Sequence, residues 1–141
     1  MSIVNQKIID FIKEHHVLTL ATSSENGPWC ANCFYTYLEN ENFFVFTSDL
    51  ETKHVQDALK QETVAASILL ETRVIGKIRG LQIQGRMFCP EKKILKKVKV
   101  AYLKNFPVAM LMKTTLWVIS PTLLKYTDNR LGFGKKLTWK L

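Results

Sequence analysis

The sequence has 141 residues, of which 47% are hydrophobic and 23% are charged, and this balance is typical of a globular chain with one sizeable core rather than a disordered chain. We therefore expect a single domain over residues 1–141. The formal net charge of +8 favours polyanionic partners, whether nucleic acid, acidic lipid or phosphorylated small molecules, and does not choose among them.

The first third of the chain predicts one helix and three strands. Apolar residues on one face favour a helix that begins after a Ser2 cap and ends near His15. Strands are expected at 17–22, 29–38 and 43–47, separated by an Asn-Gly turn and by a cluster of Asn and Glu residues. Short turns between consecutive strands favour an antiparallel meander.

The middle of the chain predicts a short helix and two more strands. Asp49 or Thr52 is expected to cap the helix, which runs to about Gln61. A strand is expected at 63–70, and the alternating pattern at 77–88 predicts a half-buried strand with a polar, nitrogen-rich face. Two glycines in this strand mark bulges or close approaches of backbone: Gly80 and Gly85.

The last third changes to helical spacing from Glu91, with lysines on much of the surface, and then predicts strands at 116–119 and 123–127. Several strands with a few short helices indicate an α+β fold, in which closure of the sheet into a barrel removes exposed edges. The lysines at 92–99 could form a nucleic-acid or lipid surface, but such a helix face is usually solvated, so we expect no nucleic-acid partner.

The sequence indicates a cytoplasmic protein that does not associate with membranes. Its N-terminus lacks the features of a secretory signal, and its apolar runs are shorter than a bilayer span. Three cysteines fit a reducing compartment. Cys30 and Cys33 have C-x-x-C spacing, but residues three apart in a strand point to opposite faces, so we interpret them as ordinary cysteines and expect no metal site.

Residues 46–54 carry the strongest chemical signal. A strand ends in two hydroxyl residues, Thr47 and Ser48, and after a short loop a helix opens at Thr52 and Lys53. Hydroxyl groups, backbone N–H groups at a helix start and a lysine can together bind a phosphate. The alternative is an ordinary helix cap followed by a solvated lysine. No histidine has partners that predict a catalytic triad, so the catalytic residues are unknown.

The order of these elements resembles the pyridoxamine-phosphate-oxidase-like FMN-binding split-barrel superfamily. Motifs along nearly the whole chain resemble, more narrowly, the YhbP-like uncharacterised bacterial family. These motifs are Trp29-Cys-Ala-Asn-Cys-Phe-Tyr35, Ile78-Arg-Gly-Leu-Gln-Ile-Gln-Gly85, Phe106-Pro-Val-Ala109 and Thr127-Asp-Asn-Arg-Leu-Gly-Phe-Gly-Lys-Lys136. The resemblance implies a homodimer of antiparallel Greek-key split β-barrels with a few short helices, and FMN in a cleft between the subunits.

The resemblance also implies roles for individual residues. The strand carrying Asn32, Cys33 and Phe34 would lie along the isoalloxazine ring. Gln82 would contact the ring, and Arg79 is a second candidate for the phosphate or the ring edge. Superfamily members often place an arginine on the second strand, where this chain has Ala31-Asn32. Lys53 would therefore be the main positive charge that binds the phosphate. The residues expected at the ribityl phosphate are Thr47, Ser48, Thr52 and Lys53.

The resulting hypothesis is an FMN-binding protein, a flavin-dependent oxidoreductase whose substrate the sequence does not identify. The alternative is a non-catalytic module that binds a phosphorylated small molecule or haem in the same cleft, with His54 as the candidate axial ligand. A basic polyanion-binding protein is the third hypothesis. Two features stay open: the loop at 128–134 is either a cover for the pocket or a plain connection, and Trp139 belongs either to the core edge or to a dimer interface.

Overall fold

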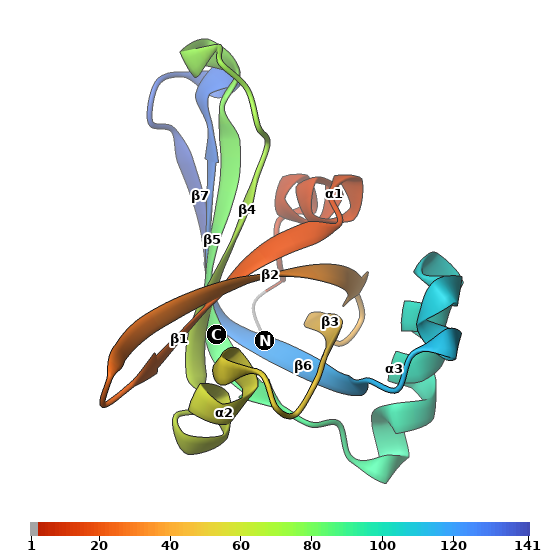
Figure 1. Ribbon diagram of the computed structural model, residues 1–141. Coiled ribbons are helices and arrows are strands. Elements are labelled where there is room, and N and C mark those ends of the chain that lie inside the picture. Colours follow the sequence, from red (N-terminus) through yellow and green to blue (C-terminus); the bar gives the residue numbers. More distant parts are fainter. Residues whose placement is uncertain (1–2) are drawn as a thin grey trace.

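Figure 1 shows the computed structural model, which describes residues 3–141. The strands form one antiparallel sheet in the order β3-β2-β1-β4-β5-β6-β7, and pairing between β3 and β6 closes all but β7 into a barrel. This confirms the predicted α+β split-barrel fold. The strands are β1 (Val17–Ser24), β2 (Gly27–Leu38), β3 (Phe43–Ser48), β4 (Thr63–Leu69), β5 (Arg79–Phe88), β6 (Thr115–Asp128) and β7 (Lys136–Lys140).

Two helices contribute apolar side chains to the barrel core. Figure 1 shows α1 (Gln6–Glu14) above the barrel strands and α2 (Lys53–Lys60) below them. The helix α1 begins at Gln6 because the Asn5 side chain accepts a hydrogen bond from the backbone of Lys7, at 2.9 Å. The predicted cap, Ser2, lies outside the described residues. Side chains from both helices join the main core cluster, namely Ile8, Phe11, Ile12, Val55 and Ala58.

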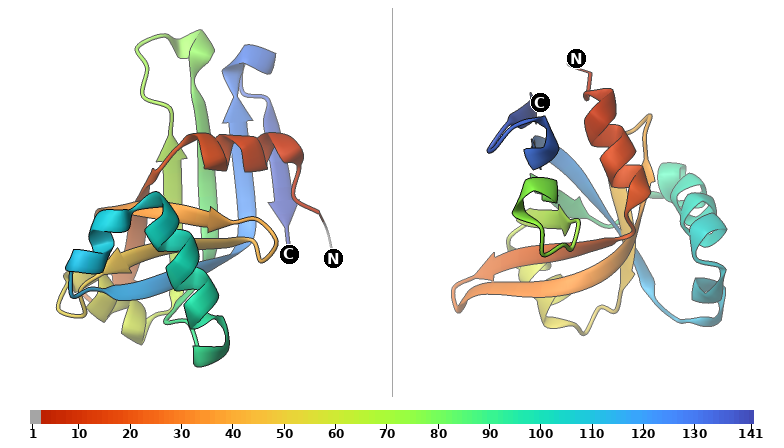
Figure 2. Two further views of the ribbon diagram at one scale, coloured as in Figure 1. Left: turned by 90° about the vertical axis from the view of Figure 1, so that its right-hand side faces the viewer. Right: turned by 90° about the horizontal axis from the view of Figure 1, so that it is seen from above.

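The third helix, α3 (Lys92–Asn105), lies outside the barrel wall, as both views of Figure 2 show. Its Val98 and Tyr102 are buried and pack with Val45 and Val118 of the wall in a second, smaller core cluster. Leu95, which helical spacing puts on the same side as Val98 and Tyr102, is 38% exposed. Three short 3-10 turns complete the chain: η1 (Ile75–Lys77), η2 (Pro107–Leu111) and η3 (Asn129–Leu131).

The two strands predicted near the C-terminus are one continuous strand, β6. Pro121 lies between the two predicted ranges, and proline cannot donate a ladder hydrogen bond. In the structure the register between β5 and β6 shifts at Gln84 and Gly85, and Pro121 lies opposite this irregularity, so β6 continues past it. The sequence also missed β7, whose Trp139 is 7% exposed and belongs to the main core cluster.

The predicted arrangement of the cysteine pair is confirmed. Cys33 is buried in the barrel core, while Cys30 is exposed, and both are free thiols. No group of three metal-ligating side chains gathers among residues 3–141. Within the same residues, no helix combines the length and apolar character that a membrane crossing requires.

Candidate functional site

The corner between β3 and α2 gathers three of the predicted phosphate ligands. Thr52 caps α2, and its hydroxyl accepts from the backbone N–H of Val55 at 3.3 Å. Ser48 Oγ is hydrogen-bonded to His54 Nε2, which also lies 3.3 Å from Thr52 Oγ1. Burial lowers the pKa of His54 and the charge of Asp57 is the smaller, opposing cause, so the site favours the neutral imidazole.

Lys53 is held against the protein rather than extended into solvent. Its Nζ lies 3.1 Å from Asp57 Oδ2 and 5.4 Å from the centre of the Trp29 ring. The buried Asp57 also accepts a 3.2 Å hydrogen bond from Thr22 Oγ1. The lysine side chain stays 42% exposed, so its ammonium group is accessible to an incoming anion. Asp57 therefore positions the cation and at the same time offsets part of its charge.

Asn32 and Phe34 point to the outer face of β2, and Cys33 between them points into the barrel. Thr19 Oγ1 on β1 donates a 2.8 Å hydrogen bond to Asn32 Oδ1. Burial raises the pKa of the Cys33 thiol to about 11. A molecule lying along this strand would therefore meet Asn32 and Phe34 through their side chains and Cys33 only through its backbone.

Tyr102 of α3 connects Thr47 to this outer face. Its hydroxyl lies 3.3 Å from Thr47 Oγ1 and donates a 3.3 Å hydrogen bond to the carbonyl of Phe34. Thr47 and Tyr102 also line a hollow of about 180 Å³ with residues of α3 and η2. Helical spacing places Tyr102 on the same side of α3 as the buried Val98, but no feature of the sequence links it to Thr47, because the contact depends on where α3 packs.

Gln82 belongs to a polar row that crosses the outer face of the sheet. Register pairs Asn32 with Thr19, Thr19 with Ser67 and Ser67 with Gln82, so the four residues lie side by side on β2, β1, β4 and β5. At about 4.8 Å between strands, Gln82 lies roughly 14 Å from Asn32. The same chain thus presents both residues on one face, but not in contact with each other.

Arg79 lies apart from the other predicted residues. It begins β5 beside α1, whereas Arg86, towards the other end of β5, pairs with Thr63 just after α2. Seven residues of strand put Arg79 roughly 23 Å from that end. Its Nη1 lies 3.1 Å from Glu14 Oε2, and its guanidinium lies 5.6 Å from the centre of the Phe11 ring.

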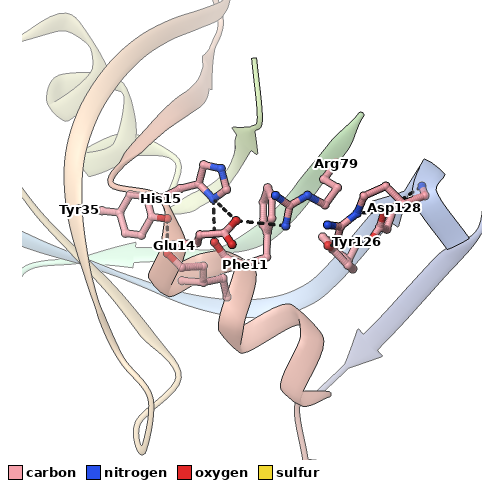
Figure 3. A network of polar contacts seen from close by, with 9 residues as sticks. Phe11, Glu14, His15, Tyr35, Arg79, Tyr126 and Asp128 are labelled. Carbon is pink, nitrogen blue, oxygen red and sulfur yellow. Dashed lines mark hydrogen bonds and ion pairs between the residues drawn. The ribbon is translucent and has the colours of Figure 1, made fainter. Parts of the chain in front are cut away.

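Figure 3 shows Arg79 within a polar network that includes Glu14, His15, Tyr126 and Asp128. All of these residues except His15 line a hollow of about 270 Å³ together with Arg130 of the 128–134 loop. Asn129 in this loop donates a 2.9 Å hydrogen bond to the carbonyl of Ile75, which fixes the loop against η1. The loop therefore lies at the Arg79 end of the sheet and does not cover the β3–α2 corner of its own chain.

Six of the nine predicted residues thus fall into two adjoining groups, while Cys33, Arg79 and Gln82 belong to neither. Ser48, Thr52 and Lys53 form the corner group, beside His54 and Trp29. Asn32, Phe34 and Thr47 form the outer-face group, connected by Tyr102. The groups meet at the end of β3, where Thr47 and Ser48 are neighbours in sequence. This geometry offers a cationic and hydroxyl-rich corner next to a flat strand face with an exposed aromatic ring.

Relatives match the chain along nearly its whole length. "UPF0306 protein plu4501" of Photorhabdus laumondii is 37% identical over 135 residues, which cover 96% of this chain and 94% of the relative. A "UPF0306 protein" of Cronobacter sakazakii is 36% identical over 132 residues, covering 94% and 92% of the two chains. No family model matches the chain.

Solved structures share the fold at low sequence identity. A heme binding protein from Mycobacterium smegmatis superposes with a TM-score of 0.79 at 18% identity, over 92% of this chain and 55% of that one. A protein of the pyridoxinephosphate oxidase family from Clostridium acetobutylicum, related to general stress protein 26, gives 0.71 at 14% identity, over 96% and 91%. A FAD-binding protein from Mesorhizobium loti gives 0.69 at 10% identity, over 84% and 88%.

Proposed function

Because this chain belongs to the UPF0306 family and has the split-barrel fold of the pyridoxamine-phosphate-oxidase-like superfamily, we propose that it binds flavin mononucleotide and acts as a flavin-dependent oxidoreductase. The observation that supports this most is the corner between β3 and α2. There Lys53, whose ammonium is held by Asp57, directly follows the cap residue Thr52, and the Ser48 hydroxyl is hydrogen-bonded to the next residue of the helix, His54. This donor set suits a phosphate group.

The start of α2 adds to this donor set. The backbone N–H groups of Lys53 and His54, the first two of the helix, donate no hydrogen bond within residues 3–141, and the helix dipole favours an anion there. In our proposal the phosphate binds at this corner, and the ring lies along the outer face of β2 against Asn32 and Phe34. Bound flavin would supply the redox chemistry, while these residues bind and orient it.

A homodimer is part of the proposal. The outer face around the polar row of Asn32, Thr19, Ser67 and Gln82 is built of small and polar side chains and has exposed apolar residues at one edge, Phe34 at 56% and Leu69 at 62%. A second copy would cover these side chains and would bring its own Gln82 or Arg79 towards the ring. Phe34→Glu with Leu69→Glu is then expected to give monomers in light scattering.

The experiment that tests the cofactor compares FMN with riboflavin, which lacks the phosphate. The wild type is expected to quench FMN fluorescence on binding and to bind FMN more tightly than riboflavin. Lys53→Met is expected to weaken FMN binding about tenfold or more, because a charged hydrogen bond is lost, and to leave riboflavin binding unchanged. Lys77→Met, on exposed η1, is the matched control. Equal affinity of the wild type for both compounds would remove the phosphate site from the proposal.

Haem binding is the second candidate, favoured by the neutral, half-buried imidazole of His54 in the corner. The fold is shared with a heme binding protein from M. smegmatis. A neutral imidazole nitrogen can ligate haem iron, provided that Ser48 releases it. A Soret band that shifts on haem titration and disappears in His54→Ala, without any FMN binding, would favour this function over the first.

A further inference from the structure

The segment 92–113, which forms α3 and η2, concentrates almost all of the net charge. It contains seven lysines and no acidic residue, whereas the rest of the chain carries 13 basic and 12 acidic side chains. The positive charge of this protein is therefore local to one segment. Figure 1 shows the segment at one side of the barrel, on the opposite side from β7.

The same segment exposes apolar side chains. Exposed fractions lie between 60% and 87% for Val100, Val108, Met110, Leu111 and Met112, and Leu111 has the highest value. Soluble proteins expose single apolar residues routinely, but a cluster of this kind marks an interaction site. A merely solvated lysine helix, as the sequence led us to expect, would not carry these exposed side chains.

Lysines surround the apolar cluster on the structure as well as in the sequence. Lys93, Lys96 and Lys97 line a shallow groove with Val100, and Lys99 lines the hollow that also contains Met110 and Met112. Lys97 is ion-paired with Glu41, but Lys93, Lys96 and Lys99 have no acidic partner within residues 3–141. We call the surface formed by Lys96, Lys99, Val100, Lys104, Met110 and Leu111 the α3–η2 surface.

We propose that the α3–η2 surface docks this protein on a bilayer that contains anionic lipids. Exposed apolar side chains enter the interface between headgroups and acyl chains, while long lysine side chains reach back to the anionic headgroups. Nucleic acid matches the charge but not the apolar side chains, because the exposed cluster contains no aromatic ring on which a base could stack. An acidic membrane surface matches both features. No residue of the corner group or of the outer-face group belongs to this surface, although Lys99 and Met110 line the same hollow as Thr47.

The experiment measures cosedimentation of the full chain with vesicles made of equal parts phosphatidylglycerol and phosphatidylcholine, and with pure phosphatidylcholine vesicles. Binding is expected only to the anionic vesicles. Raising the salt from about 0.1 M to about 1 M shortens the Debye length from about 10 Å to about 3 Å and is expected to release most of the protein. Binding to both vesicle types alike, or to neither, would overturn the proposal.

Two variants and a matched control locate the surface. Lys96→Gln with Lys99→Gln and Lys104→Gln is expected to weaken binding about 100-fold, at about fivefold for each lysine. Met110→Ser with Leu111→Ser is expected to weaken it about tenfold or more without changing the net charge. The control, Lys77→Gln with Lys135→Gln and Lys136→Gln, removes the same charge from η1 and from around β7.

All of these positions are exposed, so circular dichroism is expected to show folded variants. An equal loss in the control would reduce the effect to net charge alone and overturn the proposal. Binding to duplex DNA at the same salt without vesicle binding, or dissociation of a dimer by the Met110 and Leu111 substitutions, would assign the surface to another occupant and would overturn it too.

Discussion

The Arg79 guanidinium lies 3.1 Å from the Glu14 carboxylate and thereby ties the start of β5 to the end of α1. Only 14% of the arginine side chain is exposed, and its Nε is buried without a hydrogen-bond partner within residues 3–141. A charge this far from water depends on its partner, so the pair fixes α1 over the barrel.

We expect Arg79→Met to lower the free energy of unfolding by about 2 kcal/mol, because the substitution leaves α1 without this connection and removes the contact with Phe11. Urea denaturation measures the loss. Arg86→Met on the same strand is the control, since its ion pair with Glu62 is more than half exposed on both sides and is expected to contribute about 0.5 kcal/mol. Equal losses would mean that burial does not set the strength of the pair.

The three cysteines are expected to react differently with iodoacetamide. Cys30 and Cys89 are exposed, whereas burial raises the pKa of Cys33 to about 11 and keeps it a thiol at pH 8. Intact-mass spectrometry of the native protein should therefore show two alkylated cysteines, and three after unfolding in urea. Rapid modification of Cys33 in the native protein, or a Cys30–Cys33 disulfide, would contradict the inward direction of that side chain.

Acid is expected to destabilise the fold partly through Asp128. The side chain of Arg130 donates two hydrogen bonds to this buried carboxylate, at 3.0 and 2.9 Å, and these bonds lower its pKa. A carboxyl group with a lower pKa in the folded state stabilises the fold above its unfolded pKa of about 4, and this contribution is lost as pH falls through the folded value.

Melting temperatures between pH 7 and pH 3 test this prediction. Asp128→Asn is expected to be less stable than the wild type at pH 7, with a gap that narrows as the pH falls. Arg130→Gln is also expected to be less stable than the wild type at pH 7, because it removes the main cause of the lowered pKa of Asp128. This difference in melting temperature should likewise shrink as the pH falls. A gap that is constant over this range would show that Asp128 acts through packing alone.

Gly85 permits the close approach of β5 and β6. A Cβ atom at this position would lie 2.5 Å from the carbonyl oxygen of Ser120, on the backbone of the neighbouring strand. Gly85→Ala is expected to lower the free energy of unfolding by about 1–3 kcal/mol, because one of the strands must move. Gly76→Ala, where no atom lies within 4 Å, should stay within about 0.5 kcal/mol of the wild type in the same urea titration.

The strand pattern and the hydroxyl–lysine segment were predictable from sequence because both depend on local order. Alternation identified β5, and the Thr52 cap located the start of α2. The contact between Thr47 and Tyr102 could not be predicted, since it depends on the packing of α3 against the barrel. The continuity of β6 could not be predicted either, because the shift of register that accommodates Pro121 becomes visible only with β5 alongside.

The sequence also could not show that Arg79 and Lys53 lie far apart, because their positions depend on partners that are distant in sequence. Both residues were candidates for the phosphate from the sequence, but the sequence does not tell which end of the sheet each one occupies. That follows from the pairing of Arg79 with Asp128 and of Arg86 with Thr63, which only the folded sheet displays. The Asp57 carboxylate, by contrast, lies four residues after Lys53 on the predicted helix, a spacing that brings the two side chains together, so this ion pair could have been found from the sequence.

Closure of the barrel by β3 and β6 has a consequence for synthesis of the chain on the ribosome. Phe44 of β3 pairs with Ile119 of β6, which is synthesised 75 residues later. One edge of β3 therefore stays unpaired until most of the chain has left the ribosome. Contacts between residues so distant in sequence slow folding and leave nascent strands open to wrong partners. Newly made chains of this protein should therefore depend on chaperones until β6 has been translated.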